Sequence, residues 1–234
     1  MNKQSNIYTT VYIIVLVVLV GTALALTSLS LKERQQANSD NDKRKQILAS
    51  INITADSPES VTAEFDKYIT GQLVVNEKGD SIGDNAFAVD IAAQSKLAGA
   101  ERQLPVYICN IDNSRKYIIP LYGAGLWGPI WGYVSLNDDC STVYGAFFDH
   151  QGETPGLGAE ITKDEFRSQF NGKTVFKGDD FLPIAVVKAG QVPAGQEDYV
   201  NGISGGTITS KGVGAMLDNS LSPYRNYLDN LRKK

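Results

Sequence analysis

A long uncharged run near the N-terminus constrains this chain more than any other feature. Lys3 and Lys32 are the first two charged residues, and the run between them contains the apolar core YIIVLVVLVGTALAL, from Tyr12 to Leu26. A helix rises about 1.5 Å per residue, so about 20 apolar residues cross a bilayer core of about 30 Å. A cleaved signal peptide is the alternative, but its apolar region usually has about 7–15 residues. The length favours an uncleaved membrane anchor over residues 1–31.

The charges on either side of this run bear on its orientation. Lys3 and the N-terminus stand on one side, and the other side carries Lys32, Arg34, Lys43, Arg44 and Lys45. Because positive charge is enriched on the cytoplasmic side of a span, a literal count places the C-terminal part of the chain in the cytoplasm. The bias is moderate, since the second flank also contains acidic residues and long domains cross membranes despite such charges.

The rest of the chain predicts a polar stalk and one folded domain. Residues 32–56 are polar and of mixed charge, and they predict a helical stalk that frays. Residues 57–234 begin with a helix that Ser57 caps and Pro58 starts. Further helices are expected over residues 163–170, from the stretch after Ser204 to Leu217, and over residues 222–234 with Ser222 as cap.

Strand signals fill the centre of this domain. Aromatic and β-branched runs separated by turn residues predict antiparallel hairpins, with strands over 72–76, 104–111, 116–121, 130–136, 142–148 and 181–189. A block of strands with helices at its ends indicates an α+β fold around one curved antiparallel sheet with flanking helices.

Composition excludes several classes of function. The formal net charge is −4, and no basic run alternates with aromatic residues, so a nucleic-acid partner is not expected. Cys109 and Cys140 are the only cysteines and His150 is the only histidine, which argues against a Cys/His zinc site. The cysteines are either two free thiols or, outside the cytoplasm, a disulfide pair.

The first of three unusual stretches is GAGLWGPIWGY, from Gly123 to Tyr133. It fits a wide hairpin loop with tryptophan in the core. It equally fits a loop whose backbone approaches a flat ligand, with Leu126 or Trp127 against the face of that ligand, because glycine has no Cβ.

The second stretch is HQGETPGLGAE, from His150 to Glu160. A single histidine at the end of a strand is more often structural than a base or a metal ligand. Glu153 and Thr154 precede Pro155, which favours a rigid turn whose N–H groups and threonine hydroxyl suit an anion or a polar ring edge.

The third stretch is NGISGGTITSKG, from Asn201 to Gly212. A helix cap needs one hydroxyl, but this stretch offers Ser204, Thr207, Thr209 and Ser210. Gly205, Gly206 and Lys211 at a helix start indicate an anion site. Neither P-loop spacing nor a G-x-S-x-G motif is present.

Together, these three stretches resemble the FMN-binding domain family, in particular the C subunits of sodium-translocating NADH:quinone reductases. That family has a Gly-Leu-Trp loop, a turn like GETPGLGAE and a flavinylation motif of the form D-G-x-S/T-G-A-T, which reads NGISGGT here. The single N-terminal helix and the overall length also match. The family has Asp and Ala where this chain has Asn201 and Gly206. The glycine only loosens the turn, whereas the lost carboxylate matters if the transferase needs it to bind a metal or to orient the hydroxyl.

The resemblance implies a covalent flavin. A separate flavin transferase that uses FAD would join the Thr207 hydroxyl to the phosphate of FMN. Lys188 or Lys211 would offset the phosphate charge. No catalytic residue and no metal ligand is implied. The implied cofactor-binding residues are Thr207, Ser204, Gly205, Gly206, Thr209, Leu126, Trp127, Glu153, Thr154, Gly156, Leu157, Gly158 and Lys211.

The resemblance also implies a place in a complex. The chain would pass single electrons from NADH towards ubiquinone or menaquinone, together with the other subunits of a sodium-translocating reductase. It would cross the inner membrane once and hold its flavin domain on the periplasmic side, against the literal charge count. One alternative is the G subunit of an Rnf-type ferredoxin:NAD reductase. The other is an anchored module that binds polar ligands without redox chemistry.

Overall fold

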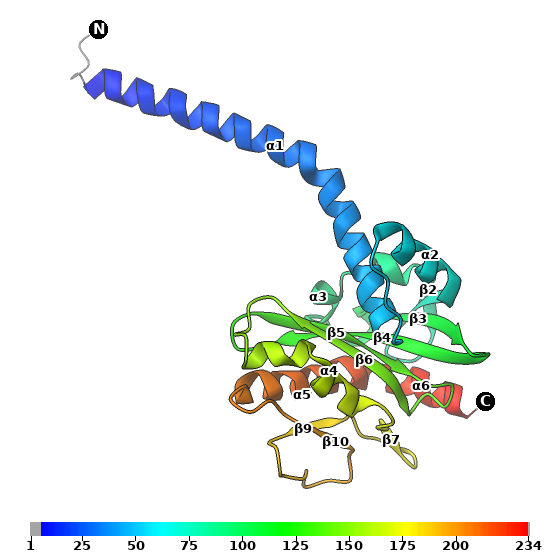
Figure 1. The fold of residues 1–234 in the computed structure, drawn as a ribbon. Coiled ribbons are helices and arrows are strands. Elements are labelled where there is room, and N and C mark those ends of the chain that lie inside the picture. The colour runs from blue at the N-terminus through cyan, green and yellow to red at the C-terminus, as the bar shows by residue number, and fades with distance from the viewer. Residues whose placement is uncertain (1–5, 234) are drawn as a thin grey trace. The chain divides into compact units, whose positions relative to one another are not determined.

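The computed structural model describes residues 6–233 (Figure 1). Lys3, which the charge count uses, lies outside this range, as do the other residues before Asn6 and Lys234. The chain forms two units, one that ends at Lys43 and a compact one that comprises Arg44–Lys234.

Helix α1 spans Asn6–Ala49 and contains the whole apolar run. An 18-residue window of this helix has a mean hydropathy of 2.5, and none of that window is buried in the structure. It is the one helix of the described chain that is long and apolar enough to cross a membrane. The polar stretch after it was expected to fray, but it continues the same helix without a break.

The end of α1 is part of the compact unit. Ile47, Leu48 and Ile51 are buried at 0%, 0% and 1% exposure, in a core with side chains from the sheet. The Ser135 hydroxyl donates to the carbonyl of Ser50 at 2.6 Å, and the chain turns at Asn52, just after the helix, with φ of 60°. The compact unit therefore starts at Arg44, whereas the sequence places the domain boundary at residue 57, because the apolar residues that end the stalk pack into the core.

Helix α2, Pro58–Tyr68, begins as predicted. The Ser57 hydroxyl accepts from the N–H of Ser60, and the Ser60 hydroxyl accepts from the N–H of Ser57, so each satisfies one backbone donor that the helix leaves open. This helix buries Val61 and Phe65.

Six strands form one antiparallel sheet in the order β2-β1-β3-β4-β5-β6. The strands are β1 (Ile69–Val75), β2 (Ser81–Gly83), β3 (Leu104–Ile111), β4 (Ser114–Ala124), β5 (Pro129–Leu136) and β6 (Val143–His150). Asp112 and Asn113 have φ of 52° and 60° in the turn between β3 and β4, as a tight hairpin turn requires. The predicted α+β class, antiparallel sheet and flanking helices are confirmed.

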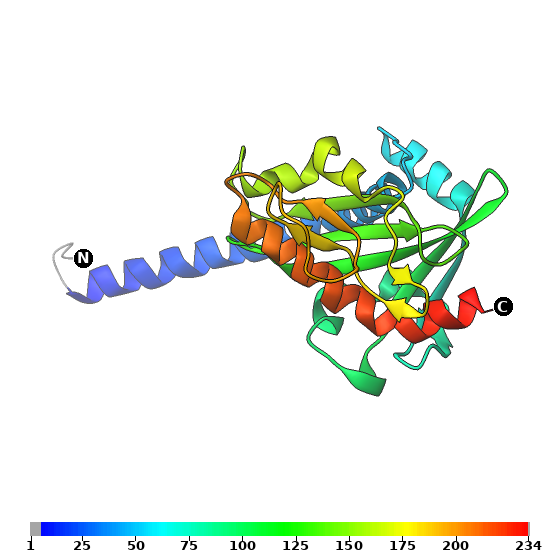
Figure 2. The same ribbon diagram turned by 90° about the horizontal axis from the view of Figure 1, so that it is seen from below.

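The sheet has a core on each face, because successive strand residues point to opposite sides. Ile118 belongs to the core with the end of α1 and α2. Tyr117 and Ile119 belong to the core with α5 (Thr207–Leu221) and α6 (Arg225–Arg232). Figure 2 shows α5 and α6, coloured orange to red, lying over the green strands.

The short elements between β6 and α5 differ in part from the prediction. They are α4 (Asp164–Arg167), β7 (Phe176–Lys177), β8 (Asp180–Phe181), β9 (Ala185–Val187) and β10 (Tyr199–Asn201), and α3 (Ile91–Gln94) precedes β3. The single strand expected over 181–189 is split into β8 and β9 around Pro183. Ser222 does not cap a new helix; it lies in a 3-10 turn, Ser222–Tyr224, between α5 and α6.

The buried end of α1 leads to a stability prediction. In a fragment that starts at Lys32, Leu48→Ala should lower the unfolding free energy by about 2–5 kcal/mol, the usual effect of truncating a buried leucine. Lys45→Ala, on the exposed side of the same turn, should change it by less than about 0.5 kcal/mol. Urea denaturation measures both, and equal midpoints would show that the end of α1 does not contribute to the core.

The two cysteines give a second prediction. Both thiols are free and buried, Cys109 in the core beside α1 and Cys140 in the core beside α5. Burial raises the pKa of each thiol to about 12, so neither is a thiolate at neutral pH. A thiol reagent at pH 8 should therefore leave both unmodified in the native protein and modify both in urea. Reaction of either one without denaturant would contradict this assignment.

Candidate functional site

The three unusual stretches meet around the first turn of α5. We call residues 125–128, between β4 and β5, the Trp127 loop, and residues 151–158, after β6, the Glu153 turn. The Trp127 loop closes through a hydrogen bond from the N–H of Gly125 to the carbonyl of Gly128, at 2.8 Å. One side chain, Glu153, is hydrogen-bonded both to the Trp127 loop and to α5.

Glu153 uses both of its carboxylate oxygens within the protein. Oε1 accepts from the N–H of Trp127 at 2.8 Å, and Oε2 accepts from the Thr209 hydroxyl at 2.5 Å. The side chain is 4% exposed, and it is the only buried acidic residue in the described part of the chain. One carboxylate thus joins the loop, the turn and the helix.

Two glycines leave room for this carboxylate. A Cβ on Gly125 would lie 2.5 Å from Oε1, and a Cβ on Gly158 would lie 2.4 Å from Oε2 and from the Thr209 hydroxyl. Any side chain at either position would therefore displace Glu153. The structure thus gives Gly158, which the resemblance implies as a cofactor contact, and Gly125, in the glycine-rich loop, a role inside the protein.

The carboxylate stays ionised despite its burial. Burial alone would raise the pKa of Glu153, but hydrogen bonds from the Thr209 hydroxyl and from the backbone N–H groups of Trp127 and Leu126 outweigh it and hold that pKa below its ordinary value. A negative charge is therefore fixed beneath the first turn of α5 at neutral pH.

His150 serves the Glu153 turn. Its Nδ1 accepts from the N–H of Glu153 at 3.1 Å, so this lone pair is used within the turn. Across residues 6–233, no group of three or more histidine, cysteine or acidic side chains is placed to hold a metal ion.

The four hydroxyls of the third stretch differ in their surroundings. Thr209 and Ser210 are buried, and their hydroxyls bond to Glu153 and to the N–H of Ile203. Ser204 and Thr207 are exposed. Thr207 is the first residue of α5, and no side chain described by the structure caps this helix, so none of the four hydroxyls serves as its cap.

Leu157 packs against the glycines before α5. Gly205 has φ of 78°, and a Cβ there would lie 2.6 Å from Cδ2 of Leu157. A Cβ on Gly206 would lie 3.2 Å from the backbone carbon of Leu157. The glycines therefore allow the Glu153 turn to approach the helix start closely.

A pocket of about 460 Å³ opens beside Thr207. Its volume lies in the range of small-ligand sites. Lys188 and Lys211, the two cations expected to offset the phosphate charge, both line it. The lining residues are Val186, Val187, Lys188, Ala189, Gln191, Gly202, Ile203, Ser204, Gly205, Thr207, Ser210 and Lys211.

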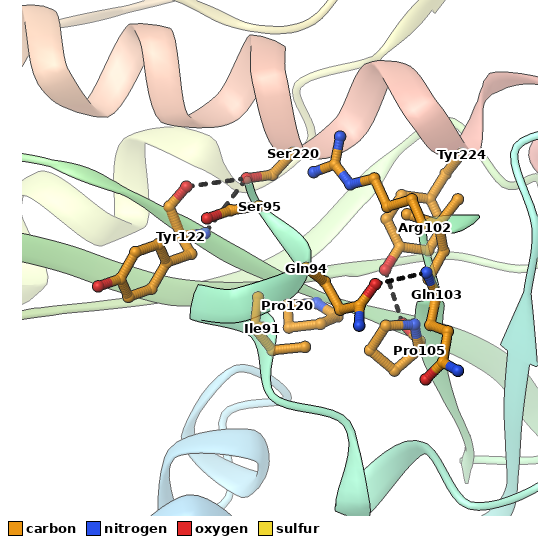
Figure 3. A pocket seen from close by; sticks show the side chains of 11 residues that line it. Ile91, Gln94, Ser95, Arg102, Gln103, Pro105, Pro120, Tyr122, Ser220 and Tyr224 are labelled. Carbon is orange, nitrogen blue, oxygen red and sulfur yellow. Dashed lines mark hydrogen bonds between the residues drawn. The ribbon is translucent and has the colours of Figure 1, made fainter. Parts of the chain in front are cut away.

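A second cleft, drawn in Figure 3, lies between α3 and the junction of α5 and α6. Gln94, Arg102 and Ser220 are among the residues that line it. It offers only about 10 Å³, which is room for about one water molecule. It is therefore too small for a cofactor.

Large apolar side chains are exposed near the helix start, outside the pocket lining. Leu126, Trp127, Leu157 and Ile208 are 47%, 68%, 42% and 57% exposed. An exposed group of this kind often marks a surface that another molecule covers. A flat aromatic ligand attached near Thr207 would shield such side chains from water.

Thr154 and Gly156 have a local role. The Thr154 carbonyl accepts from the N–H groups of Leu157 and Ala159, and the N–H of Gly156 donates to Glu160. Their side of the turn is exposed. Thr154 and Gly156 therefore shape the Glu153 turn. Neither takes part in the contact between Glu153 and α5.

Several pocket residues were not expected from the sequence. Val186, Val187, Ala189 and Gln191 reach it because β9 pairs in parallel with β10, which brings residues 185–187 beside 199–201. Gln169 also accepts from the backbone N–H of Asn201 at 2.9 Å. Strands of three residues in parallel leave no periodic pattern, so the sequence offers no signal for this arrangement.

Known proteins resemble this chain over most of its length. The family profile described as FMN-binding domain matches residues 125–222. The C subunit of the Na(+)-translocating NADH-quinone reductase of Vibrio anguillarum is 35% identical over 196 residues, which cover 76% of this chain and 75% of the relative. The protein of the same name from Pseudomonas aeruginosa is 32% identical, with 82% and 83% covered.

Solved structures agree with these relatives. The crystal structure of the C subunit of the Na(+)-translocating NADH-quinone reductase from Parabacteroides distasonis is 50% identical, with a TM-score of 0.79, and covers 85% of this chain and 96% of its own. Shewanella oneidensis NqrC is 24% identical, with a TM-score of 0.69, and covers 84% and 100%. The second likeness supports the fold alone.

Two glycines of α5 give a matched test of how closely this helix packs. A Cβ on Gly212 would lie 2.3 Å from the carbonyl oxygen of Ala124, at the end of β4, whereas a Cβ on Gly214 would lie 3.7 Å from its nearest neighbour. Gly212→Ala should destabilise the protein by about 1–3 kcal/mol, because backbone atoms must move. Gly214→Ala should stabilise it by up to about 1 kcal/mol through helix propensity. Denaturant titration of both variants measures the change in unfolding free energy, which should be opposite in sign for the two. A change of the same sign in both would contradict the close approach of α5 to β4.

Proposed function

The chain belongs to the family of the C subunits of Na(+)-translocating NADH-quinone reductases, and on this premise we propose that it is a membrane-anchored electron carrier with FMN bound covalently to Thr207. One observation carries the assignment of the residue. Thr207 is an exposed hydroxyl on the first residue of a helix that no described side chain caps, and it lies in the wall of a pocket of suitable size.

The other hydroxyls are less suitable acceptors. Thr209 and Ser210 are buried and already hydrogen-bonded. Ser204 is exposed, but it precedes the helix by three residues and does not share the position of Thr207 at the helix start. Free N–H groups and the helix dipole favour an anion at that position. Thr207 therefore combines access with a favourable electrostatic site for phosphate.

The surroundings also fit the charge and shape of FMN. Lys188 and Lys211 line the pocket and would offset the phosphate charge. Leu126, Trp127 and Leu157 are exposed apolar side chains near the same helix start, suited to the face of the isoalloxazine ring. We assign contacts with the ring or the ribityl chain to Thr154, Gly156 and Leu157. Glu153, Gly158 and Thr209 would shape the site from beneath, because all three are buried.

The protein and the cofactor would divide the work. Bound FMN supplies one- and two-electron redox chemistry, and the chain binds it, orients it and limits its exposure to water. A flavin transferase would form the linkage from FAD: the Thr207 oxygen bonds to the phosphorus on the FMN side, the phosphoanhydride bond breaks, AMP leaves, and the hydroxyl proton is released to a base. Asn201, which replaces an aspartate of the motif, would not prevent this step.

The anchor and the family name suggest the cellular setting. Helix α1 would cross the inner membrane once, with the flavin domain on the periplasmic side. The other subunits of the complex would be its partners, and electrons would pass from NADH through its flavin towards ubiquinone or menaquinone while the complex moves Na+. The names of the relatives favour this complex over an Rnf-type one. External protease should cleave the domain in spheroplasts.

Thr207→Val tests the attachment site directly. The variant should fold but lack covalent FMN, because valine has nearly the shape of threonine without the hydroxyl. Intact-mass spectrometry of protein from the native host should find the mass of one FMN less one water on the wild type and no addition on the variant. In-gel flavin fluorescence after denaturation should give the same result.

Two neighbouring substitutions serve as controls. Ser204→Ala removes the other exposed hydroxyl and should keep the flavin. Asn201→Asp restores the carboxylate of the family motif and should be flavinylated at least as fully as the wild type. Flavin fluorescence that persists in Thr207→Val after denaturation would overturn the assignment, and an unmodified wild type would favour the non-redox module.

A further inference from the structure

We propose that Glu153 is a positioning residue whose fixed charge also disfavours reduction of the flavin. Its carboxylate holds the Trp127 loop against the first turn of α5, and this charge lies beneath the site of attachment. The role in reduction rests on the proposed attachment of FMN to Thr207, whereas the positioning role does not.

The geometry assigns Glu153 to the protein rather than to a ligand. Oε1 accepts from the N–H of Trp127, Oε2 accepts from the Thr209 hydroxyl, and its own N–H donates to His150. The carboxylate also fills the space that Gly125 and Gly158 leave open. A flavin at Thr207 would therefore not contact the Glu153 side chain. Glu153 would act on the flavin indirectly, through the position of the Trp127 loop and through its electric field.

No ion pair in the described part of the chain neutralises the charge of Glu153, although the neighbouring His150 also favours the ionised form. The described residues include four ion pairs, and none of them involves Glu153. Neutral N–H and O–H donors stabilise the carboxylate instead, together with its place near the N-terminal end of α5, to which it is bound through Thr209. Its field therefore acts on groups attached at the start of the helix, where Lys188 and Lys211 in the pocket wall compensate it only in part.

This field should oppose electron transfer to the flavin. Each electron that the flavin gains adds negative charge unless a proton follows it, and a fixed negative charge nearby raises the free energy of the reduced form. The phosphate at Thr207 acts in the same direction, so the two anions together would keep the midpoint potential low.

Glu153→Gln separates charge from geometry. The glutamine carbonyl can accept from the N–H of Trp127, and its NH2 group can donate to the Thr209 hydroxyl, which is both donor and acceptor. Glu153→Ala removes both bonds, and Thr209→Val removes one of them. Glu165→Gln is the matched control for charge, because Glu165 is an exposed carboxylate on α4.

The first measurement is the flavin midpoint potential of the full chain in detergent micelles, by optical titration with dithionite. Glu153→Gln should carry a normal amount of FMN and shift the midpoint upward. The upward shift should be large enough to raise the ratio of reduced to oxidised flavin roughly tenfold at a fixed potential. Glu165→Gln should leave the midpoint unchanged. An unshifted midpoint in flavinylated Glu153→Gln would overturn the electrostatic role.

The second measurement needs no flavin. In a Thr207→Val background, hydrogen exchange at the Trp127 amide reports the bond to Glu153. Glu153→Ala and Thr209→Val should each raise its exchange rate at least tenfold, and Glu153→Gln should leave it near the wild-type rate. Unchanged protection in Glu153→Ala would overturn the positioning role. If the wild type carries no FMN, the proposed function fails while this experiment still tests Glu153.

Discussion

The candidate site depends on one buried carboxylate. Glu153 accepts hydrogen bonds from the Trp127 loop and from α5, and it is itself part of the turn after β6. Burying an ionised carboxylate is costly unless strong donors surround it, so the loss of either hydrogen bond should weaken the other. This explains why Gly125 and Gly158 flank the side chain: each keeps free the space into which the carboxylate must fit. The Trp127 loop, the Glu153 turn and the first turn of α5 are thereby held together beside Thr207.

The end of α1 imposes a comparable constraint on the opposite face of the sheet. Ile47 and Leu48 are buried in the core of the compact unit, although they belong to the helix that contains the apolar run. The Arg44 guanidinium also lies over the rings of Phe65 and Phe87, at 5.8 and 5.0 Å from their centres. The helix that would anchor the domain thus also completes its core. Such an anchor cannot be replaced by a flexible linker without loss of stability, because the residues next to it are structural.

Local signals in the sequence predicted the local structure well. Alternating apolar residues and turn residues gave the hairpins of β3 to β6, and Ser57 with Pro58 gave the start of α2. The errors arose where distant segments decide the outcome. The stalk was expected to fray because it is polar, but its last apolar residues pack into the sheet. The internal role of Glu153 was missed rather than contradicted: a sequence cannot show that both of its carboxylate oxygens accept hydrogen bonds within the protein. The pairing of β9 with β10 likewise depends on contacts that no local pattern encodes.

The proposed covalent bond to FMN is consistent with the openness of this site. Thr207 and the apolar side chains near it are exposed, and so are Lys188 and Lys211, the two cations of the pocket. A phosphate held there by charge alone would exchange with solvent anions, and the buried carboxylate of Glu153 would weaken its binding further. A deeper pocket would hold FMN without a bond but would shield it from redox partners. A covalent link to an exposed helix start keeps the flavin in place and accessible at the same time.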